Sequence, residues 1–330
     1  MNKVTWGILS TAHIARTQFI PAIGRAENAE VAGISSRGSK VHAAASELSI
    51  AKAYESYEEL LEDSDIQAVY IPLPNSLHSE WVAKAAKSGK HVLCEKPLAL
   101  NTEEALSMFQ VCREADVQLM EAFMYQFHPQ HKRVREIILS GEIGEVKIFK
   151  SSHSFYLANR DSDIRMVKEM GGGSLYDVGC YSIHAMRTIL NEEPVRVNVI
   201  ADIDSESQVD LSAYGIVKME SGITGMFDCS FDAAGRNEYE VIGTEGTIKV
   251  PYAFRPDING NIGHVIVEKP GSVRTEKIAG DIYRAEVEIF SEAILSGKGV
   301  SHLEASTIQN MKVIDACYES IEKGSSVEVQ

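Results

Sequence analysis

Residues 4–120 alternate between short runs rich in β-branched residues and longer segments with the spacing of amphipathic helices. The runs typical of strands are residues 4–9, 31–35, 68–73, 91–94 and 117–120, and the helical segments are residues 14–26, 40–48, 57–63, 78–88 and 103–115. Strands that are joined by helices pair in parallel through right-handed crossovers. The pattern therefore predicts an α/β domain in which helices cover both faces of a doubly wound parallel sheet.

The chain changes character after residue 122, where strands dominate. Candidate strands are residues 145–155, 195–203, 211–219, 224–231, 238–243, 247–250 and 264–268, and candidate helices are residues 130–140, 174–190, 283–295 and 305–323. Short turns join many of these strands, which favours antiparallel pairing. We therefore expect two domains, residues 1–122 and residues 123–330, the second an α+β domain with a large, mostly antiparallel open sheet.

Charge and cysteine content exclude several classes of protein. The 330 residues include 32 Lys and Arg against 47 Asp and Glu, a net charge of −15, which disfavours nucleic acids and anionic membranes as partners. The five cysteines are scattered and form no CxxC pair, as in proteins with reduced thiols. The sequence shows no signal peptide and no apolar stretch of about 18 residues, so we expect a cytoplasmic protein without a membrane span.

The first strand leads into a turn with the spacing of a dinucleotide-binding fingerprint. That fingerprint places glycines at three positions before and within a helix N-terminus, where N–H groups bind pyrophosphate. Ser10, Ala12 and Ala15 occupy these positions, so all three residues are small but none is glycine. An ordinary strand–helix turn remains the alternative on this evidence alone. If the domain is of the Rossmann type, the residues of the turn that bind the cofactor are Ser10, Thr11, Ala12, His13 and Ile14.

The end of the second strand indicates which dinucleotide is preferred. Enzymes that use NAD usually place an acid there to bind the ribose hydroxyls, and this chain has none. Ser36 and Arg37, with Lys40 nearby, instead offer charge-assisted hydrogen bonds to a 2′-phosphate. We therefore predict NADP rather than NAD, the alternative being an exposed basic loop with no ligand.

Three further segments resemble a known signature. Residues 71–78, 89–97 and 171–184 resemble, in order, the motifs of the Gfo/Idh/MocA oxidoreductase family, and the resemblance extends over essentially the whole chain. It lies closest to the branch with dihydrodiol and D-xylose dehydrogenases, glucose–fructose oxidoreductase and sugar 3-ketoreductases. The resemblance implies an NAD(P)-dependent dehydrogenase or reductase that acts on a CH–OH group of a sugar, cyclitol or vicinal diol. The fingerprint turn without glycine departs from many members.

The resemblance also implies roles for particular residues. The further cofactor contacts that it implies are Pro72, Leu73, Asn75, His78, Glu95, Lys96 and Pro97. It implies a cis bond between Lys96 and Pro97, which the sequence permits because cis bonds are essentially confined to X–Pro pairs. It implies a homodimer or homotetramer formed through the C-terminal sheet, which would also bury the second face of that sheet.

Lys96 and Tyr181 are the central catalytic candidates. Lys96 follows the strand of residues 91–94, and ligands of doubly wound folds collect at the carboxyl ends of strands. A phenol has a pKa of about 10, and a neighbouring ammonium group favours its ionised form. We therefore predict Tyr181 as general acid in reduction and general base in oxidation, with Lys96 polarising the substrate oxygen. The active site should then lie in the cleft where the domains meet.

Asp177 is the third catalytic candidate because Asp177, Tyr181 and His184 share one helix face. It would orient Lys96 or the substrate hydroxyls; alternatively, it caps the turn at the three glycines of residues 171–173. We interpret these glycines as a flexible entry that lets the backbone pass close to the nicotinamide.

Candidates for the substrate pocket lie near the domain junction and beyond it; they are Glu121, Tyr125, Tyr156, Arg165 and His184. His184 is equally interpretable as a core histidine, and Arg165 as a surface residue. His128 and His131 lack cysteine or carboxylate partners at ligand spacing, so we expect no metal.

Two other functions stay open at this point. One is a non-catalytic NADP-binding sensor, against which the retention of Lys96 and Tyr181 argues. The other is a redox-assisted, NAD-dependent glycosidase, in which the cofactor is recycled.

Overall fold

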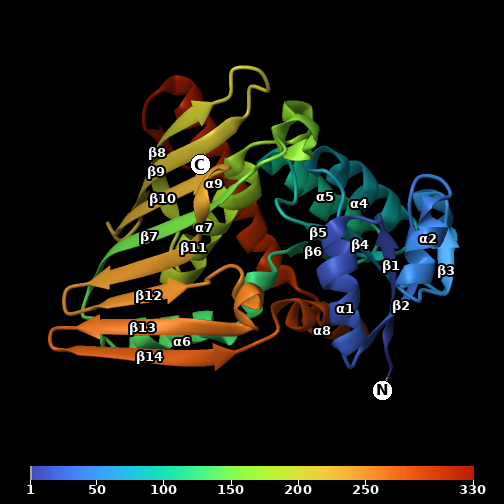
Figure 1. Cartoon of the computed structure of the whole chain (residues 1–330), viewed down its shortest axis with the longest axis horizontal. Helices are drawn as coiled ribbons and strands as arrows, with labels where there is room; N and C mark the ends of the chain where they lie inside the picture. The colour runs from blue at the N-terminus through green and yellow to red at the C-terminus, as the bar shows by residue number, and fades with distance from the viewer. Residues whose placement is uncertain (1) are drawn as a thin grey trace. The chain divides into compact units, whose positions relative to one another are not determined.

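The computed structural model describes residues 2–330, apart from the side chain of Ser301. It divides into two compact units (Figure 1), residues 2–124 with 283–308 and residues 125–282 with 309–330. The N-terminal segment of the first unit ends at residue 124, two residues beyond the domain boundary that we predicted after residue 122. The division differs from our prediction in one respect, because residues 283–308 group with the first unit and not with the second.

The first unit contains the predicted doubly wound sheet. Its six strands are β1 (Val4–Leu9), β2 (Ala29–Ser35), β3 (Lys52–Tyr54), β4 (Ala68–Ile71), β5 (His91–Glu95) and β6 (Leu119–Ala122). They pair in parallel in the order β3-β2-β1-β4-β5-β6, which reverses direction between β1 and β4. The crevice at such a reversal is where doubly wound folds bind ligands.

Helices connect these strands as the sequence predicted. They are α1 (Ile20–Arg25), α2 (Lys40–Glu47), α3 (Tyr57–Glu62), α4 (His78–Lys87) and α5 (Thr102–Glu114), and a π-helical turn, η1 (Ala15–Phe19), precedes α1. Ser56 begins α3 by accepting a hydrogen bond from the backbone N–H of Glu59, whose side chain accepts one from the N–H of Glu55. This reciprocal pair fixes where α3 starts.

Helix α8 (Ile282–Ser296) explains why a late segment belongs to the first unit. Trp6 of β1 is fully buried, and its indole N–H donates to the Ser291 hydroxyl over 3.2 Å. The rings of Trp6 and Phe290 lie 5.8 Å apart, and Asn28 donates to the backbone carbonyl of Glu288. The helix therefore completes the core beneath β1, a contact over almost 300 residues that local pattern does not reveal.

The second unit contains the large sheet, with nine strands in the order β14-β13-β12-β11-β7-β10-β9-β8-β15. They are β7 (Val146–Tyr156), β8 (Pro194–Ile203), β9 (Asp210–Met219), β10 (Thr224–Ser230), β11 (Asp232–Gly243), β12 (Thr247–Pro251), β13 (Ile262–Lys269), β14 (Ser272–Ala279) and β15 (Val327–Glu328). All neighbours are antiparallel except β7 and β10. The prediction of a mostly antiparallel sheet is confirmed.

Helices pack against one face of this sheet (Figure 1). They are α6 (Pro129–Leu139), α7 (Cys180–Leu190), which follows the π-helical turn η7 (Leu175–Gly179), and the later part of α9 (Ser301–Lys323). Ser151 of β7 bonds Ser182 of α7, and Ser320 of α9 accepts from the backbone N–H of Val199 in β8. The opposite face of β8 to β10 is open and carries exposed apolar side chains, among them Ile200 and Ile216.

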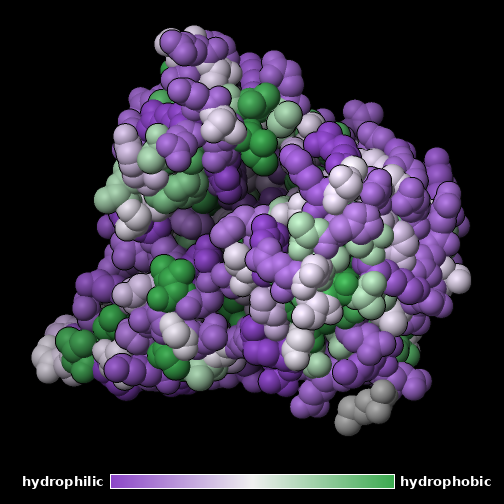
Figure 2. Space-filling view, turned by 45° about the vertical axis from the view of Figure 1, so that its right-hand side comes forward, coloured by the Kyte–Doolittle hydropathy of each residue, from purple (hydrophilic) through white to green (hydrophobic). Residues whose placement is uncertain are grey.

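Surface and core chemistry agree with the composition. The face seen in Figure 2 is mostly hydrophilic, with hydrophobic side chains in small groups. All five cysteines are buried and none forms a disulfide. Within residues 2–330, every helix is too short or too polar to cross a membrane.

Candidate active site

The fingerprint turn adopts a backbone conformation that explains why the motif usually contains glycine. Ser10 has φ of +140°, in the region that side chains disfavour. Its hydroxyl accepts a hydrogen bond from the N–H of Ala12 over 3.0 Å. Thr11 and Ala12 are half-buried and His13 is exposed, so the turn between β1 and the first helix presents its backbone and side chains at the carboxyl end of β1. The backbone of Ser10 is therefore strained in a conformation that glycine adopts without strain.

The loop after β2 carries the predicted phosphate-binding residues. Ser36 is half-buried, Arg37 is exposed, and the nearest residues of the loop include no acid. The backbone N–H of Ser36 donates to the Tyr54 carbonyl over 3.2 Å, and that of Gly38 donates to the Glu55 carbonyl over 2.8 Å. The loop is thus fixed by the segment after β3, and an exposed guanidinium at the end of β2 fits a 2′-phosphate.

Lys96 lies on a loop that side chains of α4 and β6 hold in place. The Lys96–Pro97 peptide bond is cis, as the resemblance implied. The ring nitrogens of His78 lie 2.8 Å from the Leu73 carbonyl oxygen and 3.1 Å from that of Pro97. The Glu121 carboxylate accepts from the backbone N–H of Leu98 over 2.8 Å. These contacts set the path of the main chain on either side of Lys96.

The structure places the side chains of His78 and Glu121 against the backbone of the Lys96 loop. His78 was expected to contact the cofactor, but its side chain is completely buried and its ring faces backbone carbonyls. Burial also lowers the pKa of His78, so the ring stays neutral. Glu121 was expected to follow its strand and bind substrate, but it lies inside β6 and is 4% exposed. Both residues act through the backbone of the Lys96 loop.

The remaining cofactor candidates of the first unit surround the same edge of the sheet. Pro72 and Leu73 are buried directly after β4, and Asn75 begins the 3₁₀ turn η2 (Asn75–Leu77) that leads into α4. Glu95 ends β5, and the Tyr70 hydroxyl donates to its carboxylate. The structure thus brings Leu73, Glu95 and Lys96 to the carboxyl ends of β4 and β5, the edge where a dinucleotide binds in such sheets.

In the second unit, Tyr181 lies in an aromatic box. Its ring is 5.0 Å from His153, 5.5 Å from Phe254 and 5.6 Å from Tyr125, measured between ring centroids. Tyr181 is 5% exposed. The box restricts the phenol to one orientation, since an aromatic side chain that packs on three sides cannot change rotamer freely.

His153 of β7 is a site residue that the sequence analysis missed. Its ring stacks on Phe254 with centroids 4.9 Å apart and stands at 78° to Tyr181. The alternation of β7 placed it on the covered face of the strand, but no motif distinguished it from an ordinary core position.

Tyr125 and His184, both predicted to contact substrate, form a buried pair beneath Tyr181. The Tyr125 hydroxyl lies 2.6 Å from Nδ1 of His184, and the two residues are 1% and 2% exposed. Burial raises the pKa of Tyr125 and lowers that of His184, so both side chains are neutral. The pair therefore helps to hold the rings around Tyr181 in place. The burial of His184 supports its interpretation as a core histidine.

Asp177 and Arg165 form an ion pair next to the glycine-rich entry. Arg165 Nε donates to Asp177 Oδ2 over 2.6 Å, and the backbone carbonyl of Arg165 accepts from the N–H of Gly173. A Cβ atom on Gly172 would lie 2.5 Å from the same carbonyl oxygen. Glycine at residue 172 thus leaves room for the backbone of Arg165. Close backbone packing, more than flexibility, explains why glycine stands there.

The N-terminus of the helix that carries Tyr181 is capped by Asp210 and not by Asp177. Asp210 Oδ2 accepts from the backbone N–H of Leu175 over 2.7 Å and from the Ser174 hydroxyl over 2.8 Å. Gly173 has φ of +120°, and a Cβ there would lie 2.2 Å from Asp210 Oδ1. The alternative role that we considered for Asp177 is therefore filled by a residue of β9 that the sequence analysis did not identify.

The two remaining residues, Tyr156 and His131, differ in exposure. Tyr156 is 65% exposed at the end of β7, with the Arg160 guanidinium 5.7 Å from its ring centroid. His131 is buried and bonds Tyr239 and the Ala253 carbonyl, which accounts for it as a core residue. Among residues 2–330, the structure brings together no group of three or more His, Cys, Asp or Glu that could hold a metal ion.

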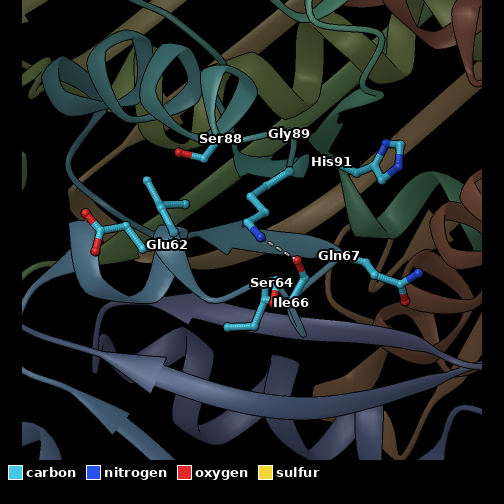
Figure 3. A pocket seen from close by; sticks show the side chains of 9 residues that line it. Glu62, Ser64, Ile66, Gln67, Ser88, Gly89 and His91 are labelled. Atoms are coloured by element: carbon cyan, nitrogen blue, oxygen red, sulfur yellow. Dashed lines mark hydrogen bonds between the residues drawn. The ribbon is translucent and has the colours of Figure 1, made fainter.

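A cavity of about 550 Å³ lies at the opposite edge of the first sheet, where β4 and β5 begin. Figure 3 shows Ser64 and Ile66 of one loop across from Ser88 and Gly89 of the other. The Lys90 ammonium donates to the carbonyls of Asp63 and Ile66, each over 2.7 Å. The Lys90 ammonium thus already binds carbonyl oxygens at the end of α3 and in the loop after it. None of the cofactor candidates lines the cavity.

Comparison with known proteins places these features in a family. Residues 4–123 match the model described as oxidoreductase family, NAD-binding Rossmann fold (GFO_IDH_MocA), and residues 131–249 match the GFO/IDH/MocA C-terminal domain. The chain is 41% identical over 326 residues to D-xylose 1-dehydrogenase (NADP(+)) 2 of Haloferax volcanii, covering 98% of this chain and 99% of that protein.

Sugar reductases are similar as well. The chain is 30% identical over 315 residues to the dTDP-3,4-didehydro-2,6-dideoxy-alpha-D-glucose 3-reductase of Actinomadura kijaniata, covering 96% of this chain and 95% of that protein. Among solved structures, a mutant of KijD10, a 3-ketoreductase from Actinomadura kijaniata, in complex with TDP-benzene and NADP has a TM-score of 0.92 at 29% identity. The match covers 97% of this chain and 98% of that chain.

Proposed function

The chain belongs to the Gfo/Idh/MocA family of oxidoreductases, and we propose that it is an NADP-dependent enzyme that interconverts an alcohol and a ketone on a sugar, cyclitol or vicinal diol. The observation that carries the proposal is the way in which each half of the catalytic pair is held. Lys96 stands on a loop fixed by His78 and Glu121, and Tyr181 stands in an aromatic box on a capped helix. Such preorganisation is typical of groups that act in a transition state.

Lys96 and Tyr181 act on the same substrate oxygen in this proposal. When bound, NADPH supplies the hydride. The Tyr181 hydroxyl donates its proton to the carbonyl oxygen during reduction, and the phenolate accepts the proton from the alcohol during oxidation. The Lys96 ammonium donates a hydrogen bond to that oxygen and stabilises the negative charge that develops on it. The charge of Lys96 also favours the ionised form of Tyr181, which oxidation requires.

Asp177 and Arg165 orient the substrate in the same proposal. A carboxylate that an arginine holds in place can accept hydrogen bonds from substrate hydroxyls in a fixed geometry. Asp177 raises the pKa of Arg165, so the guanidinium stays charged. His153 packs edge-on against Tyr181 and would limit the size of the group that fits beside the phenol.

The residues at the cofactor edge support NADP. The loop after β2 offers Ser36 and the exposed Arg37 and no carboxylate, and the similar D-xylose 1-dehydrogenase is described as NADP(+)-dependent. Residues 10–14 would bind the pyrophosphate with backbone N–H groups, and Ser36 and Arg37 would bind the 2′-phosphate.

A neutral polyol is the substrate class that the charges favour. The arginines near the glycine-rich entry are already paired, Arg160 with Asp232 and Arg165 with Asp163 and Asp177. A phosphorylated substrate would have to compete with these carboxylates. We therefore propose a free sugar as substrate. D-xylose is the first compound to test, because the similar protein from Haloferax volcanii is named a D-xylose 1-dehydrogenase.

The experiment measures NADP⁺ reduction with D-xylose and other free sugars, and NADPH oxidation with keto-sugars and diketones. Lys96→Met and Tyr181→Phe should each abolish turnover and retain NADPH binding, because phenylalanine keeps the ring contacts of the box. Near-wild-type activity in both variants would contradict the mechanism. Tight NADP binding without turnover on any substrate would identify a sensor, and release of sugar from aryl glycosides without net NADPH consumption would identify a glycosidase.

A further inference from the structure

Glu95 ends β5 directly before Lys96, and its two carboxylate oxygens bind different partners. Oε1 accepts a hydrogen bond from the Tyr70 hydroxyl of β4, and Oε2 accepts one from the backbone N–H of Lys96 over 3.3 Å. The carboxylate thus joins a side chain of the neighbouring strand to the main chain of the catalytic candidate. Because rotation of the carboxylate would break both bonds, the two partners together fix its orientation.

Tyr70 is itself fixed by the core of the first unit. It is 1% exposed, and its ring stacks on Phe19 with centroids 3.7 Å apart and planes at 16°. Phe19 in turn lies edge-on to Trp6 of β1, with centroids 5.5 Å apart. Close packing on these rings leaves the phenol one position, so its hydroxyl is a rigid donor.

The register of the sheet explains how Tyr70 reaches Glu95. In the parallel pair of β4 and β5, Tyr70 lies beside Leu93. Side chains two residues apart on a strand point to the same face, so Glu95 lies on the face of Leu93 and Tyr70. Burial, and then the charge of Glu95, raises the pKa of Tyr70 well above its usual value. The phenol therefore keeps its proton and donates it to the hydrogen bond.

A fixed Lys96 matters for the proposed chemistry. Its ammonium would donate to the substrate oxygen on which negative charge develops, and such donors act best when they are in place before the reaction. His78 and Glu121 hold the backbone that follows Lys96. The Glu95 carboxylate adds a contact at the backbone N–H of Lys96 itself.

We propose that Tyr70 is a positioning residue for the reaction: its hydroxyl fixes the Glu95 carboxylate, which fixes the backbone from which the Lys96 side chain reaches the substrate oxygen. Tyr70 touches neither substrate nor cofactor in this role and acts through Glu95. The role rests on the proposed function, which makes Lys96 catalytic. It goes beyond that function because it assigns part of the turnover rate to a core residue of β4.

Steady-state kinetics and NADPH titrations of variants of the full chain test this role. Tyr70→Phe keeps the ring against Phe19 and removes only the hydroxyl. Glu95→Gln keeps the size of the side chain, but an amide accepts hydrogen bonds only through its one oxygen, so it cannot hold both partners. The matched control is Tyr54→Phe on the edge strand β3, because its hydroxyl also donates to a carboxylate, that of Asp63.

We expect Tyr70→Phe to lower kcat by about tenfold, the effect of losing one hydrogen bond to a charged group. The KM for the sugar and the dissociation constant for NADPH should stay within about twofold, since the lost contact acts on the transition state. The double variant of Tyr70→Phe and Glu95→Gln should have the kcat of the slower single variant, because both substitutions break the same chain of contacts. Tyr54→Phe should keep the wild-type kcat.

Other results would overturn this role and show where it fails. A wild-type kcat in Tyr70→Phe would mean that the hydroxyl does not act on Lys96. A loss of NADPH binding as large as the loss in kcat would mean that Tyr70 orders the cofactor site instead. Fully additive losses in the double variant would mean that Tyr70 and Glu95 act independently.

Two further readouts keep the test decisive. Glu95→Gln is judged by the same changes in kcat and KM, so the test stands even if Tyr70→Phe does not fold. If the wild type turns over no sugar, the proposed function fails first and the role of Tyr70 fails with it. Turnover by the wild type with an unchanged kcat in both single variants would refute the role of Tyr70 alone.

Discussion

Asp210 Oδ2 lies 2.7 Å from the backbone nitrogen of Leu175, so a strand of the large sheet caps the helix that carries Tyr181. The same carboxylate accepts from Ser174 and, through Oδ1, from the Tyr318 hydroxyl of α9. A helix N-terminus has N–H groups without partners inside the helix, and a carboxylate binds them favourably. The position of Tyr181 therefore depends on a side chain far from it in the sequence.

Replacing Asp210 tests this dependence. Asp210→Ala should lower the free energy of unfolding by about 2 kcal/mol, because the cap is lost and buried donors are left without acceptors. Turnover should fall as well, while the dissociation constant for NADPH should stay unchanged, since the candidate cofactor residues belong to the first unit. Chemical denaturation, steady-state kinetics and NADPH titration measure the three effects.

Tyr318→Phe is the matched control for Asp210→Ala. It removes one of the donors to the carboxylate, a contact of 3.1 Å, and leaves the cap of Leu175 in place. We expect a smaller loss of stability and little change in turnover. Wild-type stability and turnover in Asp210→Ala would show that the cap does not position the catalytic helix.

Ser10 provides a test of strain at the fingerprint turn. A non-glycine residue with φ of +140° costs about 1–3 kcal/mol. Ser10→Gly should remove that cost and lose the hydrogen bond from Ala12, worth about 1 kcal/mol. Ser10→Ala loses the same bond and keeps the strain. Thermal unfolding should therefore rank Ser10→Gly above Ser10→Ala in stability, and equal melting temperatures would rule out strain at this residue.

The parts of the fold that depend on local pattern were predictable from the sequence. The alternation of strands and helices predicted the parallel sheet, and the helical segment predicted over residues 57–63 corresponds to α3. The strand β3 was missed because its three residues are too few to show a period, and β14 because its side chains are mostly exposed and polar. Both missed strands lie at the edge of a sheet, where few side chains are buried and the sequence shows little alternation of apolar and polar residues.

The site was predictable only in part, for a related physical reason. Motifs pointed to Lys96, Tyr181 and Asp177 as catalytic candidates, because their residue types suit the proposed chemistry. The side chains that hold them in place come from distant segments, as Asp210 does for the Tyr181 helix and Glu121 does for the Lys96 loop. A buried carboxylate on a strand has no local signature, and only the tertiary contacts identify its partner.

The open face of the large sheet tests the predicted oligomer. Ile200 and Ile216 are 68% and 58% exposed there, on the adjacent strands β8 and β9. Exposed apolar side chains in a group favour association, and a homodimer or homotetramer through the sheet would cover them. The double variant Ile200→Lys and Ile216→Lys should therefore run as a monomer in size-exclusion chromatography with light scattering.

The control for this prediction is Leu139→Lys. Leu139 is 86% exposed on α6, so the substitution adds half the charge of the double variant and removes an exposed apolar side chain elsewhere. We expect it to leave the molar mass unchanged. A monomeric wild type, or a double variant with the mass of the wild type, would contradict association through this face.

Buried neutral histidines should make the protein less stable in mild acid. Burial lowers the pKa of His131 from 6.5 to about 3, and its ring donates from Nε2 to the Ala253 carbonyl and accepts from Tyr239. Between these pH values the unfolded chain takes up a proton that the folded chain does not. Stability from this residue is therefore complete above about pH 6.5 and falls by about 1.4 kcal/mol per pH unit below it.

Urea denaturation of the wild type and His131→Gln at pH 7.5 and pH 5.5 measures this effect. The variant is expected to be less stable at pH 7.5, because it loses buried hydrogen bonds. The difference should shrink at pH 5.5 by about 1.4 kcal/mol, since glutamine does not titrate. A constant difference between the wild type and His131→Gln would mean that His131 binds its proton equally in the folded and unfolded chains.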